Sequence, residues 1–198
     1  MIVAGLTGSI AMGKSETARM FRDAGIPVFD ADAAVHKLYE AGGKAVTLIA
    51  GRFPSAIVNG AVDRARLSWL VLGTAQALSD LESIVHPLVW AEEEIFLDKQ
   101  RQLGAKLVMI DNPLLFEKQR HKNLDAVIVV SAPGDVQRSR AFDRPGMTAE
   151  KFDAILARQV PDSEKRARAD FVIDSSRGLA YARQQVMNII STLRDGNA

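Results

Sequence analysis

Residues 8–15 of the chain read GSIAMGKS and fit the pattern G-x-x-x-x-G-K-[ST] of a phosphate-binding loop. The glycines let the backbone turn so that successive N–H groups converge on one phosphate, and the helix that follows directs the positive end of its dipole at the same anion. Lys14 would reach the β- and γ-phosphates, and the hydroxyl group of Ser15 would bind Mg²⁺. The motif therefore predicts a nucleoside triphosphate site, whose residues are Gly8, Ala11, Met12, Gly13, Lys14, Ser15 and Glu16.

Three aspartates follow short apolar runs, at the strand ends where open α/β sheets bind their ligands. Asp30 and Asp32 come after a run at 27–29, and Asp111 ends a run at 106–110. A carboxylate there could accept the proton of an acceptor hydroxyl group, a role that we assign to Asp32 rather than to Asp30. Asp111 is placed like the Mg²⁺-linked acid of P-loop enzymes. The alternative for each aspartate is a helix or turn cap.

Two arginines four residues apart, Arg140 and Arg144, precede the turn-forming pair Pro145-Gly146. A hinge-like turn beside two guanidinium groups predicts a lid that closes over the nucleotide and stabilises the transferring phosphoryl group. The other basic residues between Arg138 and Arg168 are interspersed with acidic ones, which is typical of solvated helix faces.

The elements that must position these residues alternate between strands and helices. Short runs rich in Val and Ile predict buried strands at 2–7, 27–29, 106–110, 125–130 and 170–173. Helices are predicted at 15–24 and near the end of the chain, where one face carries Leu179, Ala182, Val186, Ile189, Ile190 and Leu193. This alternation predicts an α/β fold, a three-layer P-loop NTPase core around a parallel, doubly wound sheet.

Residues 33–103 differ from the rest, because they carry helical patterns and no convincing strand. The patterns lie at 33–41, 44–53, 64–72 and 74–103, and Pro87 is expected to kink or restart the last of them. Trp69 and Trp90 are expected in the core of this segment. We therefore expect one domain over residues 1–198, divided into a core at 1–32, 104–137 and 169–198, a helical substrate-binding subdomain at about 33–103 and a short lid at about 138–168.

Composition narrows the possible functions. The 198 residues include 25 lysines and arginines against 24 aspartates and glutamates, and this net charge of +1 predicts no binding to nucleic acid by bulk electrostatics. The chain has no cysteine, which excludes thiolate catalysis, disulfides and Cys-based metal sites. No apolar run is long enough to span a membrane, and no basic residue precedes Lys14 as a signal peptide would require. We expect a soluble, cytoplasmic globular protein, with its oligomeric state left open.

The motifs together resemble the dephospho-CoA kinase family over nearly the whole chain. The resemblance rests on the phosphate-binding loop, FDAD at 29–32, VDR at 62–64, IVHPL at 84–88 and DNPLLFE at 111–117. It continues through Gln137, Arg140, Arg144 and ADFVID at 169–174. The loop alone is generic, whereas the Asp-Ala-Asp, His-Pro and Asp-x-Pro-Leu-Leu-Phe-Glu elements together are specific to this family.

The resemblance implies a P-loop kinase that uses MgATP to phosphorylate the 3′-hydroxyl group of dephospho-CoA, the last step of coenzyme A synthesis. It implies that Asp32 is the base or orienting group for that hydroxyl, and that Arg140 and Arg144 belong to a lid over the ATP phosphates, where Lys14 also acts. The acceptor site that it implies comprises Asp32, His86, Asp111, Pro113, Leu115, Phe116 and Glu117.

Four residues depart from the pattern of that family. Ala11 replaces a glycine, so the backbone there must avoid positive φ or be strained. Glu16 stands where threonine is common and places a carboxylate near the phosphates, which could weaken ATP binding. Asn112 replaces an apolar residue, and His36 stands where arginine is usual. These departures bear on affinity rather than on the identity of the family.

Other functions remain open on the sequence. A kinase for nucleoside monophosphates or for a sugar alcohol would use the same core with a different acceptor pocket. A regulator that binds ATP without turnover would have no need of Asp32 or of the arginine pair. A nucleic-acid-dependent ATPase fits poorly with the net charge of +1.

Overall fold

The computed structural model describes residues 1–72, 74–194 and 196. The chain divides into two compact units. The core unit comprises Met1–Phe29 and Gln100–Ala198, and the helical unit comprises Asp30–Lys99. Each unit is described by itself below.

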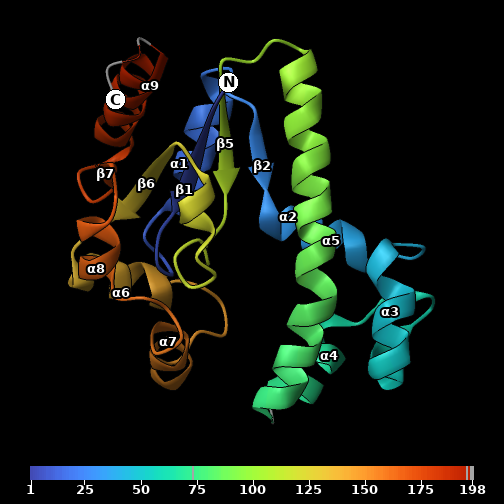
Figure 1. Cartoon of the computed structure of the whole chain (residues 1–198). Coiled ribbons are helices and arrows are strands. Elements are labelled where there is room, and N and C mark those ends of the chain that lie inside the picture. Colours follow the sequence, from blue (N-terminus) through green and yellow to red (C-terminus); the bar gives the residue numbers. More distant parts are fainter. Residues whose placement is uncertain (73, 195, 197–198) are drawn as a thin grey trace. The chain divides into compact units, whose positions relative to one another are not determined.

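A five-stranded sheet forms the centre of the core unit (Figure 1). Its order is β2-β5-β1-β6-β7, with the strands at Val28–Asp30, Leu107–Asp111, Ile2–Thr7, Ala126–Ser131 and Phe171–Asp174. Strand β1 pairs in parallel with both β5 and β6, and β6 pairs in parallel with β7. The predicted parallel sheet is therefore confirmed, and each predicted strand lies within about one residue of the observed one. Because β1 lies between the strands of two later segments, the loop that leaves its carboxyl end sits where such sheets bind ligands.

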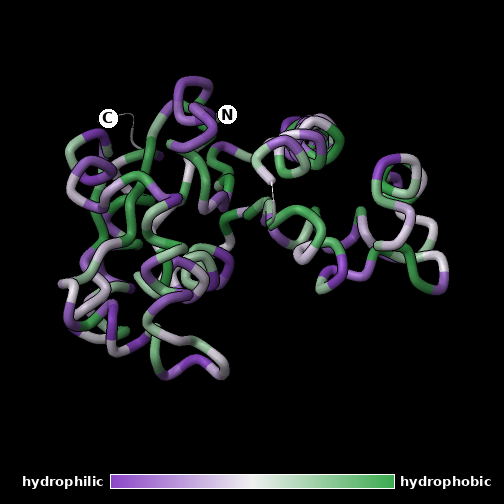
Figure 2. Tube along the Cα trace, turned by 90° about the horizontal axis from the view of Figure 1, so that it is seen from below, coloured by the Kyte–Doolittle hydropathy of each residue, from purple (hydrophilic) through white to green (hydrophobic). Residues whose placement is uncertain are grey.

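The two faces of the sheet carry separate apolar clusters. Helices α1 (Lys14–Asp23) and α9 (Leu179–Arg194) cover one face, against alternate residues of β6 such as Ile128 and Val130. The intervening residues Val127 and Val129 pack on the opposite face with the segment that follows β5. In Figure 2, hydrophobic residues gather in the interior of this unit, and hydrophilic residues are more frequent in its outer turns. These clusters fix the sheet edge from which the phosphate-binding loop emerges.

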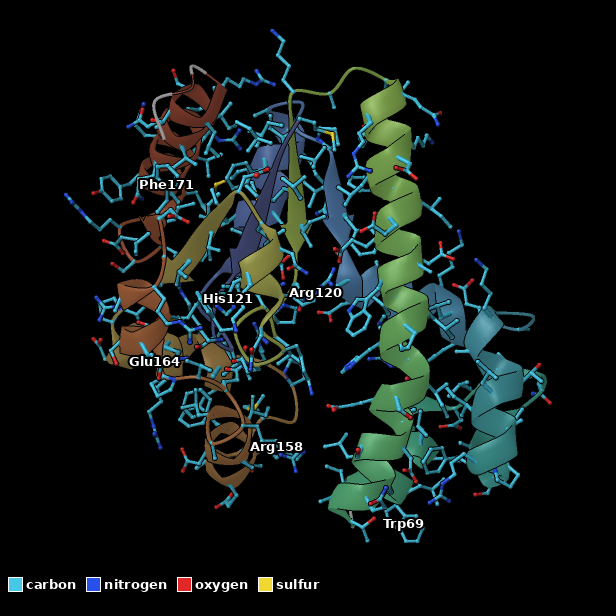
Figure 3. All side chains as sticks on the ribbon, viewed as in Figure 1. Trp69, Arg120, His121, Arg158, Glu164 and Phe171 are labelled. Atoms are coloured by element: carbon cyan, nitrogen blue, oxygen red, sulfur yellow. The ribbon has the colours of Figure 1, made fainter. Side chains whose placement is uncertain are left out.

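Three short helices lie between β6 and β7: α6 (Gly134–Phe142), α7 (Ala149–Leu156) and α8 (Asp162–Ala167). Figure 3 labels Arg158, just after α7, and Glu164 on α8. Both are exposed, as expected of solvated helix faces. Lys165 departs from that expectation, because its side chain is fully buried.

The helical unit contains α2 (Ala31–Tyr39), α3 (Lys44–Arg52), α4 (Arg64–Leu72) and most of α5 (Ala75–Gln102). The four predicted helices are confirmed. Of the two effects expected at Pro87, a kink or a restart, the restart is wrong, because α5 continues through this residue. The expectation of no strand is also wrong, since β3 (Ile57–Val58) and β4 (Ala61–Val62) form an antiparallel hairpin. Two-residue strands carry no usable periodicity; the available signal was the Asn59-Gly60 turn, where both residues have positive φ.

Both tryptophans lie on the surface of the helical unit, which corrects the expectation that they form its core. Trp69, labelled in Figure 3, is 80% exposed, and Trp90 is 40% exposed. The ring of Trp90 stacks on that of His86 with centroids 5.8 Å apart. Within the described residues, none of the helices combines the length and apolarity needed to cross a membrane.

Candidate active site

The phosphate-binding loop connects β1 to α1, and two of its glycines are required by geometry. A Cβ atom on Gly8 would lie 2.6 Å from the carbonyl oxygen of Val130, so this position accepts no side chain without backbone movement. Gly13 has φ 93° and is the N-cap of α1, where a glycine has no side chain to cap the helix. The first N–H groups of α1 are therefore available to an anion, and the helix dipole favours negative charge there.

Ala11 adopts φ 61°, so the strained alternative foreseen for this position is the observed one. A left-handed conformation costs an alanine about 1–2 kcal/mol. Its methyl group is buried in an apolar cluster with Ala141 of α6 and Phe152 of α7. Packing of the loop against these helices holds the strained residue in place.

Two predicted site residues lie together: Lys14, the first residue of α1, and Asp111, the last residue of β5. The ammonium nitrogen Nζ of Lys14 lies 2.6 Å from Oδ1 of Asp111. The side chains are 14% and 3% exposed, so water screens the attraction between the two charges poorly. The buried carboxylate thus holds the lysine beside the uncapped start of α1.

Arg140, on α6, reaches the same loop through Ser175. Its guanidinium group donates to the hydroxyl and to the carbonyl oxygen of Ser175, both at 2.8 Å. The hydroxyl group of Ser175 in turn donates to the carbonyl oxygen of Met12 at 2.7 Å. Sequence reasoning missed Ser175; the signal was its position directly after β7, at the carboxyl end of the sheet.

A cavity of about 260 Å³ opens beside this arginine. Its lining includes Gly13, Glu16, Arg140, Arg144, Ser175 and Leu179. The exposed side chain of Arg144 therefore joins the loop glycine and Arg140 at one cavity within the core unit. Nearby, hydrogen bonds from the hydroxyl and N–H groups of Ser176 hold the pKa of Asp174 below its usual value, which keeps that carboxylate ionised.

The segment after β5 begins with a tight turn. The side chain of Asn112 accepts a hydrogen bond from the N–H group of Leu114 at 2.9 Å. The carbonyl oxygen of Pro113 accepts one from the hydroxyl group of Thr7 at 3.3 Å. This hydrogen bond explains why asparagine stands at position 112, because an apolar side chain could not close the turn in this way.

The apolar residues of this segment face the interior. Leu115 is 0% and Phe116 3% exposed, and both pack against Val127 and Val129 of β6. The ring of His121, labelled in Figure 3, packs on Phe116 with centroids 4.9 Å apart. Leu115 and Phe116 thus anchor the segment, and their side chains are covered by the core unit itself.

Glu117 ends this segment and forms a buried ion pair with Lys165 of α8. Nζ of Lys165 lies 2.8 Å from Oε1 of Glu117, and the side chains are 0% and 10% exposed. The same Oε1 atom accepts a hydrogen bond from the N–H group of Val160 at 2.9 Å. The pair therefore ties α8 to the segment that follows Asp111.

Replacing Lys165 with methionine is expected to lower the free energy of unfolding by about 3 kcal/mol, because it leaves the buried Glu117 carboxylate without its counter-charge. Urea denaturation of the unmodified and variant chains measures this loss. Adding Glu117→Gln to Lys165→Met removes the buried charge while keeping an acceptor for the Val160 N–H group, so the double variant should recover most of the loss. A double variant no more stable than Lys165→Met would contradict the ion-pair account.

The remaining predicted residues belong to the helical unit. Asp30 is the N-cap of α2, and its side chain accepts a hydrogen bond from the N–H group of Ala33 at 2.9 Å. Asp32 lies in the first turn of the same helix and is exposed. His86 lies on α5, half-buried beside Trp90. The two aspartates therefore differ, since the cap role foreseen as an alternative is taken by Asp30.

Glu16 lines the cavity beside Arg140 and pairs with Arg19 one turn along α1. Glu16→Thr is expected to tighten ATP binding about two- to fivefold at low salt, because it removes a carboxylate near the phosphates. Isothermal titration calorimetry at two salt concentrations measures the change, which should shrink at high salt. Arg19→Ala is the matched control and should weaken binding, since it leaves the Glu16 charge uncompensated. Unchanged affinity in Glu16→Thr would mean that the carboxylate lies too far from the nucleotide to matter.

The residues at the start of α1 would suit a magnesium ion that binds together with a nucleotide. Searching the described part of the chain finds no group of three or more His, Cys, Asp or Glu side chains that could hold a metal ion. Mg²⁺ bound with a nucleotide needs only one or two protein ligands, because phosphate oxygens and water complete its shell. Ser15 offers an exposed hydroxyl group next to Lys14 at the start of α1, which meets that requirement.

The sequence of this chain is similar to those of known proteins over nearly its whole length. The family model for dephospho-CoA kinase matches residues 1–180. A dephospho-CoA kinase of Mesorhizobium japonicum is 54% identical over 194 residues, which cover 98% of this chain and 98% of that one. The similarity therefore extends well beyond the phosphate-binding loop.

Two solved structures share the fold over nearly their whole length. A crystal structure of a Thermus thermophilus protein has 32% identity and a TM-score of 0.84, covering 96% of each chain. The dephospho-CoA kinase from Campylobacter jejuni has 25% identity and a TM-score of 0.74, covering 99% of this chain and 98% of that one. These matches confirm the predicted three-layer α/β P-loop fold.

Proposed function

This chain belongs to the dephospho-CoA kinase family, and from that premise we propose that it transfers the γ-phosphoryl group of ATP to the 3′-hydroxyl group of dephospho-CoA. The resemblance found in the sequence is thereby confirmed at the level of the family and its reaction, the last step of coenzyme A synthesis. The observation that carries the proposal within the structure is the placement of Lys14 and Arg140 beside the uncapped start of α1. Converging cations and N–H groups are what a transferring phosphoryl group requires.

ATP would bind with its β- and γ-phosphates in the loop at residues 8–15. Lys14 reaches the phosphates from one side, and Arg140 and Arg144 reach them from the cavity side. Because these groups are already held in place by Asp111 and Ser175, little reorganisation accompanies charge development in the transition state.

Ser15 would hold Mg²⁺ together with phosphate oxygens. When bound, the ion neutralises charge on the β- and γ-phosphates. Ser15, as the second residue of α1, keeps its hydroxyl group beside Lys14, so that both act on the same phosphates.

Asp32 would accept or orient the proton of the acceptor 3′-hydroxyl group, which makes that oxygen a better nucleophile. This assignment rests on its position two residues after β2 and on its exposed, ionisable side chain. His86 would contribute to the acceptor site from α5, and Asp111 and Pro113 from the turn after β5. Leu115, Phe116 and Glu117 would support that turn through their burial.

The test is ADP release from MgATP with dephospho-CoA, with AMP, with adenosine and with no acceptor. Turnover that depends on dephospho-CoA, with a product one phosphate heavier, supports the proposal. Turnover with AMP or adenosine instead would replace the acceptor while keeping a kinase. Tight ATP binding without ADP release under any condition would favour a regulator that binds ATP without turnover.

A further inference from the structure

Both main-chain polar groups of Ile10, in the phosphate-binding loop, are bonded to glutamine side chains from outside the loop. The N–H group of Ile10 donates to Oε1 of Gln159 at 3.0 Å. Its carbonyl oxygen accepts from Nε2 of Gln137 at 2.8 Å. Gln137 lies on α6, and Gln159 lies between α7 and α8. Two segments more than a hundred residues away in sequence therefore hold the two peptide groups that flank the Cα atom of Ile10.

Ile10 directly precedes Ala11, the strained position of the loop. Ile10 also packs against the cluster formed by Ala11, Ala141 and Phe152. A left-handed alanine persists only where its surroundings fix the backbone. The hydrogen bond from Gln137 fixes the peptide between Ile10 and Ala11, and the bond to Gln159 fixes the preceding peptide. The apolar cluster holds the methyl group of Ala11.

The two glutamines are not interchangeable. A main-chain N–H group can only donate and a carbonyl oxygen can only accept, so the partner atoms settle which end of each amide faces Ile10. Gln137 must donate, and Gln159 must accept. Gln137 is 7% exposed, so water cannot readily replace its hydrogen bond.

We propose that Gln137 and Gln159 are positioning residues that hold the phosphate-binding loop in the backbone conformation that binds ATP. Neither lines the cavity that Gly13 and Arg140 share, although Gln137 lines a second cavity together with Met12. Both glutamine side chains contact the loop at the main chain of Ile10. ATP affinity should then depend on the hydrogen-bonding direction of each amide and not on its charge or size. The inference rests on ATP binding at this loop, as proposed above, but on no particular acceptor.

The same substitution at the two positions tests this proposal, because glutamate has nearly the size and shape of glutamine. Gln137→Glu replaces the donor with a carboxylate facing a carbonyl oxygen, and the Kd for MgATP is expected to rise about ten- to a hundredfold. Gln159→Glu keeps an oxygen acceptor for the Ile10 N–H group, and the Kd should stay within about threefold. Calorimetric titration of each variant with MgATP gives both values without turnover.

Further measurements separate positioning from a general loss of structure. Gln137→Met removes the donor without adding a charge and should still weaken MgATP binding, which keeps the test valid if Gln137→Glu fails to fold. In turnover assays the KM for MgATP should rise with the Kd, while the KM for dephospho-CoA changes little. Equal effects of glutamate at both positions, or unchanged MgATP affinity in both Gln137 variants, would overturn the proposal. If the unmodified chain binds MgATP but phosphorylates no dephospho-CoA, only the proposed function fails.

Discussion

Replacing Lys14 with methionine is expected to lower kcat/KM for MgATP by about three orders of magnitude. The ammonium group lies 2.6 Å from the buried carboxylate of Asp111, which holds it beside the start of α1. Negative charge on the oxygens around the transferring phosphoryl group must be balanced in the transition state, so most of the loss should fall on kcat. We expect the Kd for MgATP to rise only about tenfold, since the N–H groups of the loop remain. Calorimetry and steady-state kinetics separate the two effects.

Two variants control for this prediction. Lys14→Arg keeps the positive charge but replaces a compact ammonium group with a planar guanidinium group, so only partial activity should remain. Asp111→Asn keeps Lys14 and alters the group that orients it, so its loss should be smaller than that of Lys14→Met. If Lys14→Met retained more than about a tenth of kcat/KM, Lys14 would not act on the transferring phosphoryl group.

Features that depend on local pattern were predictable from the sequence. Strands β5 and β6 are continuous apolar runs because helices or loops cover both faces, and this signal placed them within about one residue. The apolar face of α9 is buried at Ala182, Val186 and Ile190, as its periodicity predicts. Leu179 is the exception at 61% exposure, because it lies in the first turn of α9 beside the cavity.

Features that depend on distant segments meeting were not predictable. The family pattern includes Gln137 but suggests no role for it. The role that we propose depends on its hydrogen bond to Ile10, which lies 127 residues earlier in the sequence. Lys165 stands among charged residues that favour a solvated helix, yet it is buried because α8 packs against β6 beside Glu117. At Ala11 the sequence did indicate that the backbone could be strained, because alanine replaces a glycine there. Only the observed φ shows that the strain is present.

The structure distinguishes Asp30 from Asp32, which the sequence left as candidates for the same two roles. Both follow β2 closely, and both carboxylates were candidates for catalysis or capping. The hydrogen bond to the Ala33 N–H group commits Asp30 to the cap. Asp32 lies inside the first turn of α2, where it cannot cap that helix from outside. The catalytic assignment therefore rests on Asp32 alone.

Asp32→Asn is expected to lower kcat by about two to four orders of magnitude while the Kd for MgATP stays within about twofold. Asparagine keeps the shape of the side chain but cannot accept a proton from the acceptor hydroxyl group. Quenched-flow measurement of ADP formation in a single turnover tests the chemical step directly, without product release. Calorimetric titration with MgATP on the same preparation confirms that the nucleotide site is intact.

Asp30→Asn is the matched control, because it makes the same change two residues earlier on the same helix. Asparagine caps helices about as well as aspartate, so α2 should keep its stability and kcat should change little. A large loss in Asp32→Asn beside near-normal turnover in Asp30→Asn would separate proton transfer from helix capping. Near-normal turnover in Asp32→Asn would remove it as the base, and the acceptor hydroxyl group would then need another proton acceptor.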